Sequence, residues 1–190
     1  MNRSDITIRP ETEQDLPMID ELVRRTFREH TGYSDGEDEV ALIHEICAGR
    51  FYRRELSFVA ECDGQLVGHF MFSAFPLSPA PEGGCAPENT DYLLLAPVAV
   101  HADHVHKGIG ITMLRLGLAE AKKQPVRGIL VEGDPRFYNR LGFETSVKYG
   151  IRATSGFPLE NPDCMMVMET RPGSLAGANG YVVYDMYEHC

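Results

Sequence analysis

The stretch that decides the fold is residues 93–122, LLLAPVAVHADHVHKGIGITMLRLGLAEAK. An apolar run leads into a polar turn, a glycine pair at Gly108 and Gly110, and a segment with the apolar spacing of a helix. Glycines let a ligand approach the backbone closely, and the first N–H groups of a helix attract negative charge. The order strand, glycine turn, helix therefore predicts a backbone site for an anion, with Lys107 as an added charge.

The glycine turn does not match the common nucleotide-binding motifs. Residue 113 is Met, so the third glycine of GxGxxG is missing, and no GK[ST] sequence follows. An acidic ribose-binding residue about 20 residues further on and a repeating βαβ pattern are also missing, which disfavours a dinucleotide enzyme. A plain strand-to-helix turn remains the alternative to a phosphate site.

Composition excludes several other classes of protein. The 190 residues suffice for one domain with a full core, and the formal net charge of -10 argues against a general nucleic-acid binder. No run approaches the ~18 apolar residues of a membrane span, and the first residues contain no apolar signal region, so we expect a cytoplasmic protein without a membrane partner. The five scattered cysteines form no CxxC pair, so neither zinc nor disulfides are indicated.

Hydrophobic spacing and turn signals predict the remaining elements. A strand at residues 6–9 precedes a helix at 13–29, which a capping box of Thr12 and Asp15 would start. A loop at 30–39 leads to a second helix that ends at Gly49. A hairpin is expected next, with strands at residues 57–62 and 65–75 joined by the turn Asp63–Gly64.

The second half alternates strands and helices. Residues 92–100 read as a buried strand, in which Pro97 predicts a bulge or a place where strands splay. We expect a helix at 110–122, a strand at 128–132, a short helix at 136–140, strands at 143–150 and 165–169, and a loop-like tail with a last strand at 180–184. This order predicts a mixed α/β sheet in a single domain.

A second chemically informative stretch is GDPRFYNRLGF, residues 133–143. Pro135 suits the start of a helix, and Tyr138 would then lie just beyond the preceding strand. A tyrosine hydroxyl at that place can act as a general acid, although a tyrosine on a short helix is more often a packing residue.

Taken together, LLLAPVAVH and GDPRFYNRLGF resemble the GNAT superfamily of acyl-CoA-dependent N-acetyltransferases, in particular a bacterial small-acetyltransferase branch. The family's phosphate motif, [Q/R]-x-x-G-x-[G/A], falls on residues 105–110, with Val105 in place of Gln or Arg. The resemblance implies one domain over residues 1–190, with a core of about residues 5–170 and a tail at 171–190. It also implies a central, mostly antiparallel sheet that is splayed at the strand carrying Pro97 and flanked by helices.

Acetyl-CoA is the cosubstrate that the resemblance implies, with no metal. Backbone groups near Pro97 would hold the pantetheine arm, and the glycine turn would hold the pyrophosphate. The residues expected to bind the cosubstrate are Val98, Ala99, Val100, His106, Lys107, Gly108, Ile109, Gly110, Ile111 and Asn139.

The reaction implied is direct attack of a neutral amine on the thioester, with Tyr138 protonating the leaving thiolate. The amine must lose a proton, and the candidates for the base are Glu132, His69 or a chain of waters. His69 could equally be a packed strand residue, and Glu132 could cap the turn that follows it. The acceptor is a small-molecule amine or a protein amino group, and the family often forms homodimers. The alternative is a non-catalytic module that binds acyl-CoA as a regulatory ligand.

Overall fold

The computed structural model describes residues 6–31, 34–83, 90–105, 107–154 and 161–184. The chain forms two compact units. The first comprises Met1–Phe72 and Pro97–Ala119, and the second comprises Ser73–Ala96 and Glu120–Cys190. No helix in the described ranges combines the length and the apolar character needed to cross a bilayer.

The strands form one large and one small sheet. The large sheet has seven strands in the order β1-β2-β3-β4-β5-β8-β6, and β7 pairs with β9 in the small one. Among the described strand registers of the large sheet, only β4 with β5 is parallel. This confirms the predicted mixed, mostly antiparallel α/β fold. The strands are β1 Ile6–Pro10, β2 Ser57–Cys62, β3 Gln65–Phe75, β4 Tyr92–Val100, β5 Gly128–Glu132, β6 Glu144–Thr145, β7 Ile151–Ala153, β8 Met165–Glu169 and β9 Gly180–Val182.

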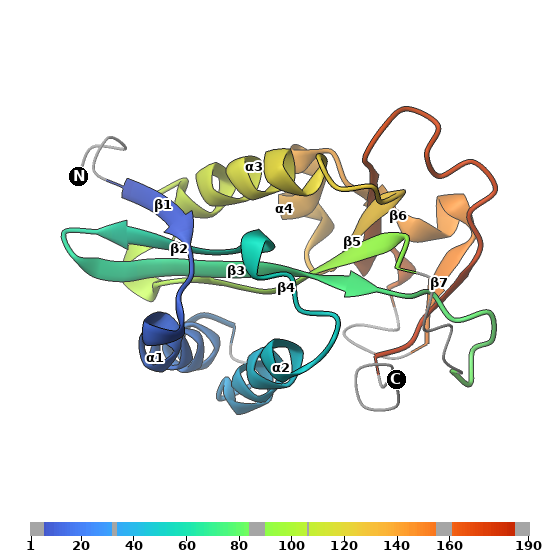
Figure 1. Cartoon of the computed structure of the whole chain (residues 1–190). Coiled ribbons are helices and arrows are strands. Elements are labelled where there is room, and N and C mark those ends of the chain that lie inside the picture. The colour runs from blue at the N-terminus through green and yellow to red at the C-terminus, as the bar shows by residue number, and fades with distance from the viewer. Residues whose placement is uncertain (1–5, 32–33, 84–89, 106, 155–160, 185–190) are drawn as a thin grey trace. The chain divides into compact units, whose positions relative to one another are not determined.

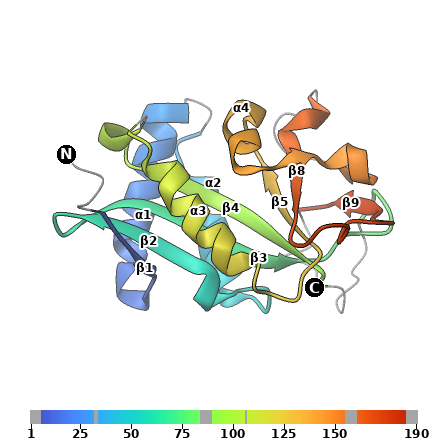
Figure 2. The ribbon, with the colours of Figure 1, turned by 90° about the horizontal axis from the view of Figure 1, so that it is seen from above.

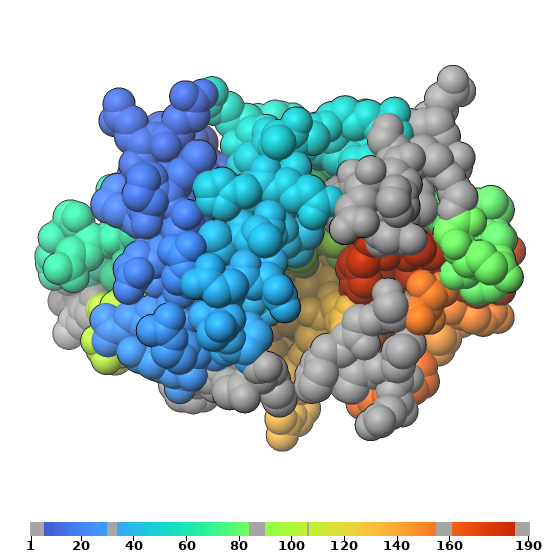
Figure 3. Space-filling model, turned by 90° about the horizontal axis from the view of Figure 1, so that it is seen from below, coloured from blue at the N-terminus to red at the C-terminus, as the bar shows by residue number. Residues whose placement is uncertain are grey.

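Three helices cover the strands of the first unit. They are α1 Leu16–Thr26, α2 Glu37–Ala48 and α3 Ile109–Ala121. α1 and α2 lie on one face of β1–β3, and α3 lies on the other (Figures 1 and 2). The space-filling view shows α1 in blue beside α2 in cyan, forming a continuous helical surface (Figure 3). The two faces of these strands therefore have different helical neighbours.

Two glycines bring α3 close to β3. A Cβ placed at Gly117 of α3 would lie 2.2 Å from the Phe70 ring, and one at Gly68 of β3 would lie 2.4 Å from the sulfur of Met113. Real Cβ atoms do not approach other atoms this closely, so a side chain at residue 117 would displace the Phe70 ring and one at residue 68 would displace the flexible end of Met113. Gly68 and Phe70 therefore face α3, and residue 69 between them points to the face covered by α1 and α2.

The predicted capping pattern forms at the 3-10 turn Glu13–Asp15, which leads directly into α1. Thr12 and Asp15 form a capping box, and the Thr12 N–H donates to Asp15 Oδ2 at 2.7 Å. Arg9 donates to both oxygens of the same carboxylate, at 2.7 and 2.8 Å. The hydrogen bond from Arg9 is the main reason that the pKa of the buried Asp15 lies well below its usual range.

The predicted hairpin is confirmed. β2 and β3 are joined by Asp63 and Gly64, with φ of 52° and 77°. Positive φ at both positions is the mark of a type I′ turn, whose twist matches that of antiparallel strands.

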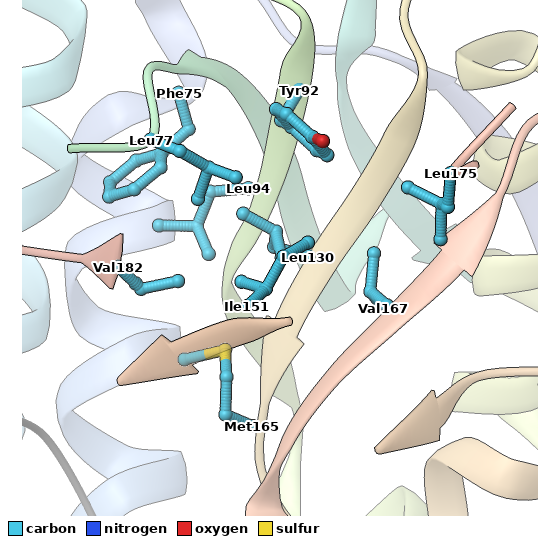
Figure 4. Close-up of a cluster of buried hydrophobic side chains, with 10 residues drawn as sticks. All are labelled: Phe75, Leu77, Tyr92, Leu94, Leu130, Ile151, Met165, Val167, Leu175 and Val182. Atoms are coloured by element: carbon cyan, nitrogen blue, oxygen red, sulfur yellow. The ribbon is translucent and has the colours of Figure 1, made fainter. Parts of the chain in front are cut away.

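The second unit has its own apolar core (Figure 4). Leu94 of β4, Leu130 of β5 and Val167 of β8 meet there, and Leu175 and Val182 join them from the C-terminal stretch. The stretch expected to be a loop-like tail therefore contributes buried side chains to this core. The short helix α4, Pro135–Tyr138, follows β5 in the same unit.

The strand predicted at residues 143–150 is wrong. Only Glu144–Thr145 is extended, and Ser146–Tyr149 forms a 3-10 turn that ends at Gly150 with φ of 76°. The Ser146 hydroxyl donates to the carbonyl of Ile151 at 3.0 Å, and this side-chain bond closes the turn in place of a strand ladder. The chain becomes extended again in β7, at Ile151–Ala153.

Candidate active site

The predicted anion turn forms at the start of α3. Gly108 has φ of 82°, a conformation that suits glycine, and α3 begins at the next residue. Thr112 donates both its backbone N–H and its hydroxyl to the Gly108 carbonyl, at 3.1 and 3.0 Å. The N–H groups of Ile109, Gly110 and Ile111 precede this first helical bond, so they lie where a helix start offers donors to an anion.

The segment before the turn carries the adjacent charges. Lys107 is exposed, whereas the pKa of His104 is lowered by its burial, then by Lys107 and His101. All three effects disfavour a positive charge on His104. Arg25 of α1 lies 2.8 Å from Nε2 of His101, which ties this segment to the end of α1. His106 lies outside the described residues.

The end of β4 carries the residues expected to bind the pantetheine arm. The Ala99 side chain is buried, and those of Val98 and Val100 are half-buried. The carbonyl of Val100 accepts a hydrogen bond from the Thr26 hydroxyl at 3.1 Å. The described pairing of β4 with β5 covers Tyr92–Leu94 and Gly128–Leu130, so Pro97 lies beyond that register, as expected of a residue without an N–H.

His69, a candidate base, is buried in β3 and not solvent-exposed. Its Nε2 lies 2.7 Å from Oε2 of Glu11, which is also buried. The other oxygen of Glu11 accepts from the Tyr52 hydroxyl at 2.7 Å. Neither Glu11 nor Tyr52 stands out in the sequence, because no local pattern marks a carboxylate that will be buried against a histidine far along the chain.

Glu132, the other candidate base, ends β5 and is half-buried. Its carboxylate accepts a hydrogen bond from the Tyr184 hydroxyl. The Tyr184 ring packs edge-on against Phe75, with ring centres 6.3 Å apart. Tyr184 is a second partner that the sequence did not reveal.

Tyr138, the candidate acid, lies at the end of α4 and is 9% exposed. Its ring packs edge-on against Phe137 and Phe143, with centres 5.0 and 5.8 Å apart. Gly133 allows this placement, since a Cβ there would lie 2.6 Å from the tyrosine ring. Burial raises the pKa of Tyr138 above its ordinary value, so its hydroxyl keeps its proton at neutral pH and can only donate it.

Asn139 follows Tyr138 and is exposed. It borders a cavity of about 650 Å³ within the second unit. The cavity is lined by Pro135, Asn139, Gly142, Phe143, Glu144, Thr145, Asn161 and Asp163. Within the described ranges, no three His, Cys, Asp or Glu side chains are grouped so as to hold a metal ion.

The chain resembles known acetyltransferases along nearly its whole length. A family model described as acetyltransferase (GNAT) domain matches residues 53–145. The uncharacterized N-acetyltransferase YhbS of Escherichia coli K12 is 28% identical over 183 residues, which is 96% of each chain.

Solved structures agree with this match. The crystal structure of Escherichia coli YhbS in complex with CoA has a TM-score of 0.77 and 27% identity, covering 98% of this chain and 93% of that one. A GNAT family acetyltransferase from Brucella melitensis, in complex with acetyl-CoA, has a TM-score of 0.69 and 25% identity, covering 96% and 97%. The resemblance seen in residues 93–122 and 133–143 is thereby confirmed: both stretches lie within the residues that match the GNAT acetyltransferase model, and the chain is similar to GNAT acetyltransferases along nearly its whole length.

Proposed function

We propose that this protein transfers an acetyl group from acetyl-CoA to a primary amine. The observation that carries the proposal is the start of α3, where Gly108 at positive φ precedes a helix of 13 residues. This arrangement fits a pyrophosphate, because backbone donors and the helix dipole both favour an anion there. The relatives crystallised with CoA and acetyl-CoA have the same fold over nearly the whole chain, which supports the assignment.

The remaining cosubstrate contacts follow the family resemblance. Backbone groups of Val98, Ala99 and Val100 bind the pantetheine arm, and the Val98 N–H polarises the thioester carbonyl. Lys107 supplies a charge beside the pyrophosphate, and Asn139 contributes a polar contact to the cosubstrate. Val105 supplies no side-chain donor, so the backbone carries most of the phosphate binding.

Chemistry proceeds by direct attack. The neutral amine forms a bond to the thioester carbon, the carbon–sulfur bond breaks, and Tyr138 gives its proton to the leaving thiolate. The phenol is protonated when the thiolate forms, which the role requires, while its raised pKa makes it a weaker acid than an exposed tyrosine. Glu132 and His69 are the two side chains proposed for accepting a proton from the amine.

The test is thiol release from acetyl-CoA with a panel of small amines and of peptides that carry a free α- or ε-amino group. CoA binding is measured in parallel by calorimetry. Turnover with at least one amine is the expected result. Absence of both binding and turnover would refute the proposal.

A non-catalytic module that binds acyl-CoA for regulation is the second candidate, and Val105 in place of the family's Gln or Arg is the observation that favours it. Clear CoA binding without turnover on any amine would support this alternative.

A further inference from the structure

The first unit contains a chain of three polar side chains, of which His69 and Glu11 are buried and Tyr52 is half-buried. The His69 side chain is 0% exposed and that of Glu11 is 3% exposed, with 2.7 Å between Nε2 and Oε2. The Tyr52 hydroxyl donates to the other carboxylate oxygen at 2.7 Å. Burial and then the hydrogen bond to Glu11 raise the pKa of Tyr52, so this phenol stays a donor. Both oxygens of Glu11 are therefore engaged, and its orientation is fixed from two sides.

This arrangement determines which nitrogen of His69 can act as a base. A carboxylate only accepts hydrogen bonds, so the facing Nε2 carries a proton. In the neutral imidazole, Nδ1 is then the nitrogen that holds the lone pair. Nδ1 is buried and has no hydrogen-bond partner in the part of the chain that is described. A buried nitrogen in that situation is the usual place for an ordered water.

The strand register places His69 beside the expected thioester site. The His101 N–H donates to the Val67 carbonyl at 3.0 Å, which pairs the start of β3 with the end of β4. The two neighbouring strands are therefore antiparallel, and His69 lies across from Ala99. Directly opposite residues share a face of the sheet, so His69 and Ala99 point to the same side.

That side is the one away from α3. The adjacent residues Gly68 and Phe70 meet Met113 and Gly117 of α3, so His69 points to the face covered by α1 and α2. His69 therefore lies on the opposite face of the sheet from the helix that carries the pyrophosphate turn.

We propose that His69 is the general base of acetyl transfer and that Glu11 is its positioning residue, an inference that rests on the proposed function. Nδ1 takes one proton from the acceptor ammonium through a single water, and Glu11 stabilises the imidazolium that forms. The neutral amine then bonds to the thioester carbon, the carbon–sulfur bond breaks, and Tyr138 protonates the thiolate. The second amine proton restores Tyr138 through water, and the proton on His69 passes to solvent, so one proton is released per turnover.

The first experiment compares His69→Gln and Glu11→Gln with the wild type on two peptides. One carries a lysine ε-amine of pKa ~10.4, and the other only a free α-amine of pKa about 8. At about pH 9 most of the α-amine is already neutral, so it needs no base before attack. We expect kcat to fall about 10- to 100-fold with the ε-amine and only about threefold with the α-amine, with acetyl-CoA affinity unchanged.

A matched control is Asp15→Asn, which removes another buried carboxylate of the same unit that is bound to Arg9 and Thr12 rather than to a histidine. Its kcat should equal that of the wild type on both peptides. Equal losses with both peptides in the Gln variants would indicate distortion and overturn the assignment, as would unchanged kcat. If the wild type itself transfers to no amine, the proposed function fails first and the base assignment falls with it.

The second experiment needs no acceptor. In protein labelled with ¹⁵N-histidine, the His69 signals should show a protonated Nε2 and a bare Nδ1, and Glu11→Gln should shift the Nε2 signal while the fold is kept. A proton on Nδ1 in the wild type would overturn the proposal even if acetyl transfer is observed.

Discussion

The hydroxyl of Tyr184 donates a hydrogen bond to the carboxylate of Glu132 at the end of β5. That carboxylate already accepts a hydrogen bond, and His69 is assigned as the base. Glu132→Gln should therefore keep kcat within about threefold of the wild type.

Tyr184→Phe removes the hydroxyl but keeps the ring contact with Phe75. It should lower the free energy of unfolding by about 1 kcal/mol. Thiol-release kinetics and urea unfolding measure the two effects. A loss of more than about tenfold in kcat for a folded Glu132→Gln variant would move the base role to Glu132.

Tyr138→Phe tests the general acid. The ring contacts with Phe137 and Phe143 remain, so stability should change by less than about 1 kcal/mol, while kcat falls about ten- to a thousandfold. Since burial raises the pKa of Tyr138, its ionisation should cause no loss of wild-type rate below the ordinary tyrosine value of about 10. Tyr149→Phe, whose hydroxyl donates to Glu144 in the same unit, is the control and should leave kcat unchanged. An equal rate for Tyr138→Phe would mean that another group protonates the thiolate.

Gly108→Ala tests the anion turn. A side chain disfavours φ of 82° by about 1–2 kcal/mol, so the free turn in the variant should relax. Restoring the turn on binding then costs that energy, and CoA affinity measured by calorimetry should weaken by roughly 5- to 30-fold. Gly173→Ala is the matched control, because φ there is 77° and an added Cβ would meet nothing within 4 Å. It should reduce stability by a similar amount and leave CoA affinity unchanged. Equal affinities for wild type and Gly108→Ala would exclude this turn as the pyrophosphate site.

Asp15→Asn should destabilise the protein in a pH-dependent way. The folded-state pKa of Asp15 is depressed, chiefly by the hydrogen bond from Arg9, so its contribution is present above the unfolded value of about 3.9 and is lost as pH falls through the folded value. At neutral pH the variant should lose about 1–3 kcal/mol of unfolding free energy, and the difference should shrink in acid. Urea unfolding at several pH values measures it. The control is Asp103→Asn, whose side chain is 70% exposed; it should change the free energy of unfolding little at any pH. If the loss of unfolding free energy for Asp15→Asn did not depend on pH, the ion pair with Arg9 would not be its cause.

Elements governed by neighbouring residues were predictable from the sequence. The hairpin follows from Asp63 and Gly64, which adopt the positive φ values that its turn requires. The Thr12–Asp15 capping box is a contact over three residues and also forms as expected. The strand expected at residues 143–150 is replaced by a turn, which the bond from Ser146 to the Ile151 carbonyl and the positive φ of Gly150 both stabilise.

Contacts between distant segments were not predictable. His69 and Glu11 are 58 positions apart, and Tyr184 and Glu132 are 52 apart. No spacing rule links such residues, so the candidate bases could be named from the sequence while their partners could not. Glu11 in particular reads as one more acidic residue near the start of a helix, because its partners Tyr52 and His69 lie far along the chain.

Because α3 packs closely on β3, the residue that is tolerated at position 117 depends on the residue at position 70, and the reverse. With the Phe70 ring in place, residue 117 cannot gain even a methyl group, because its Cβ would lie 2.2 Å from that ring. A substitution at 117 becomes acceptable only after residue 70 has become smaller, so the order in which the two changes occur matters during divergence. In an alignment of relatives, glycine at the first position and a large aromatic residue at the second should therefore be gained and lost together.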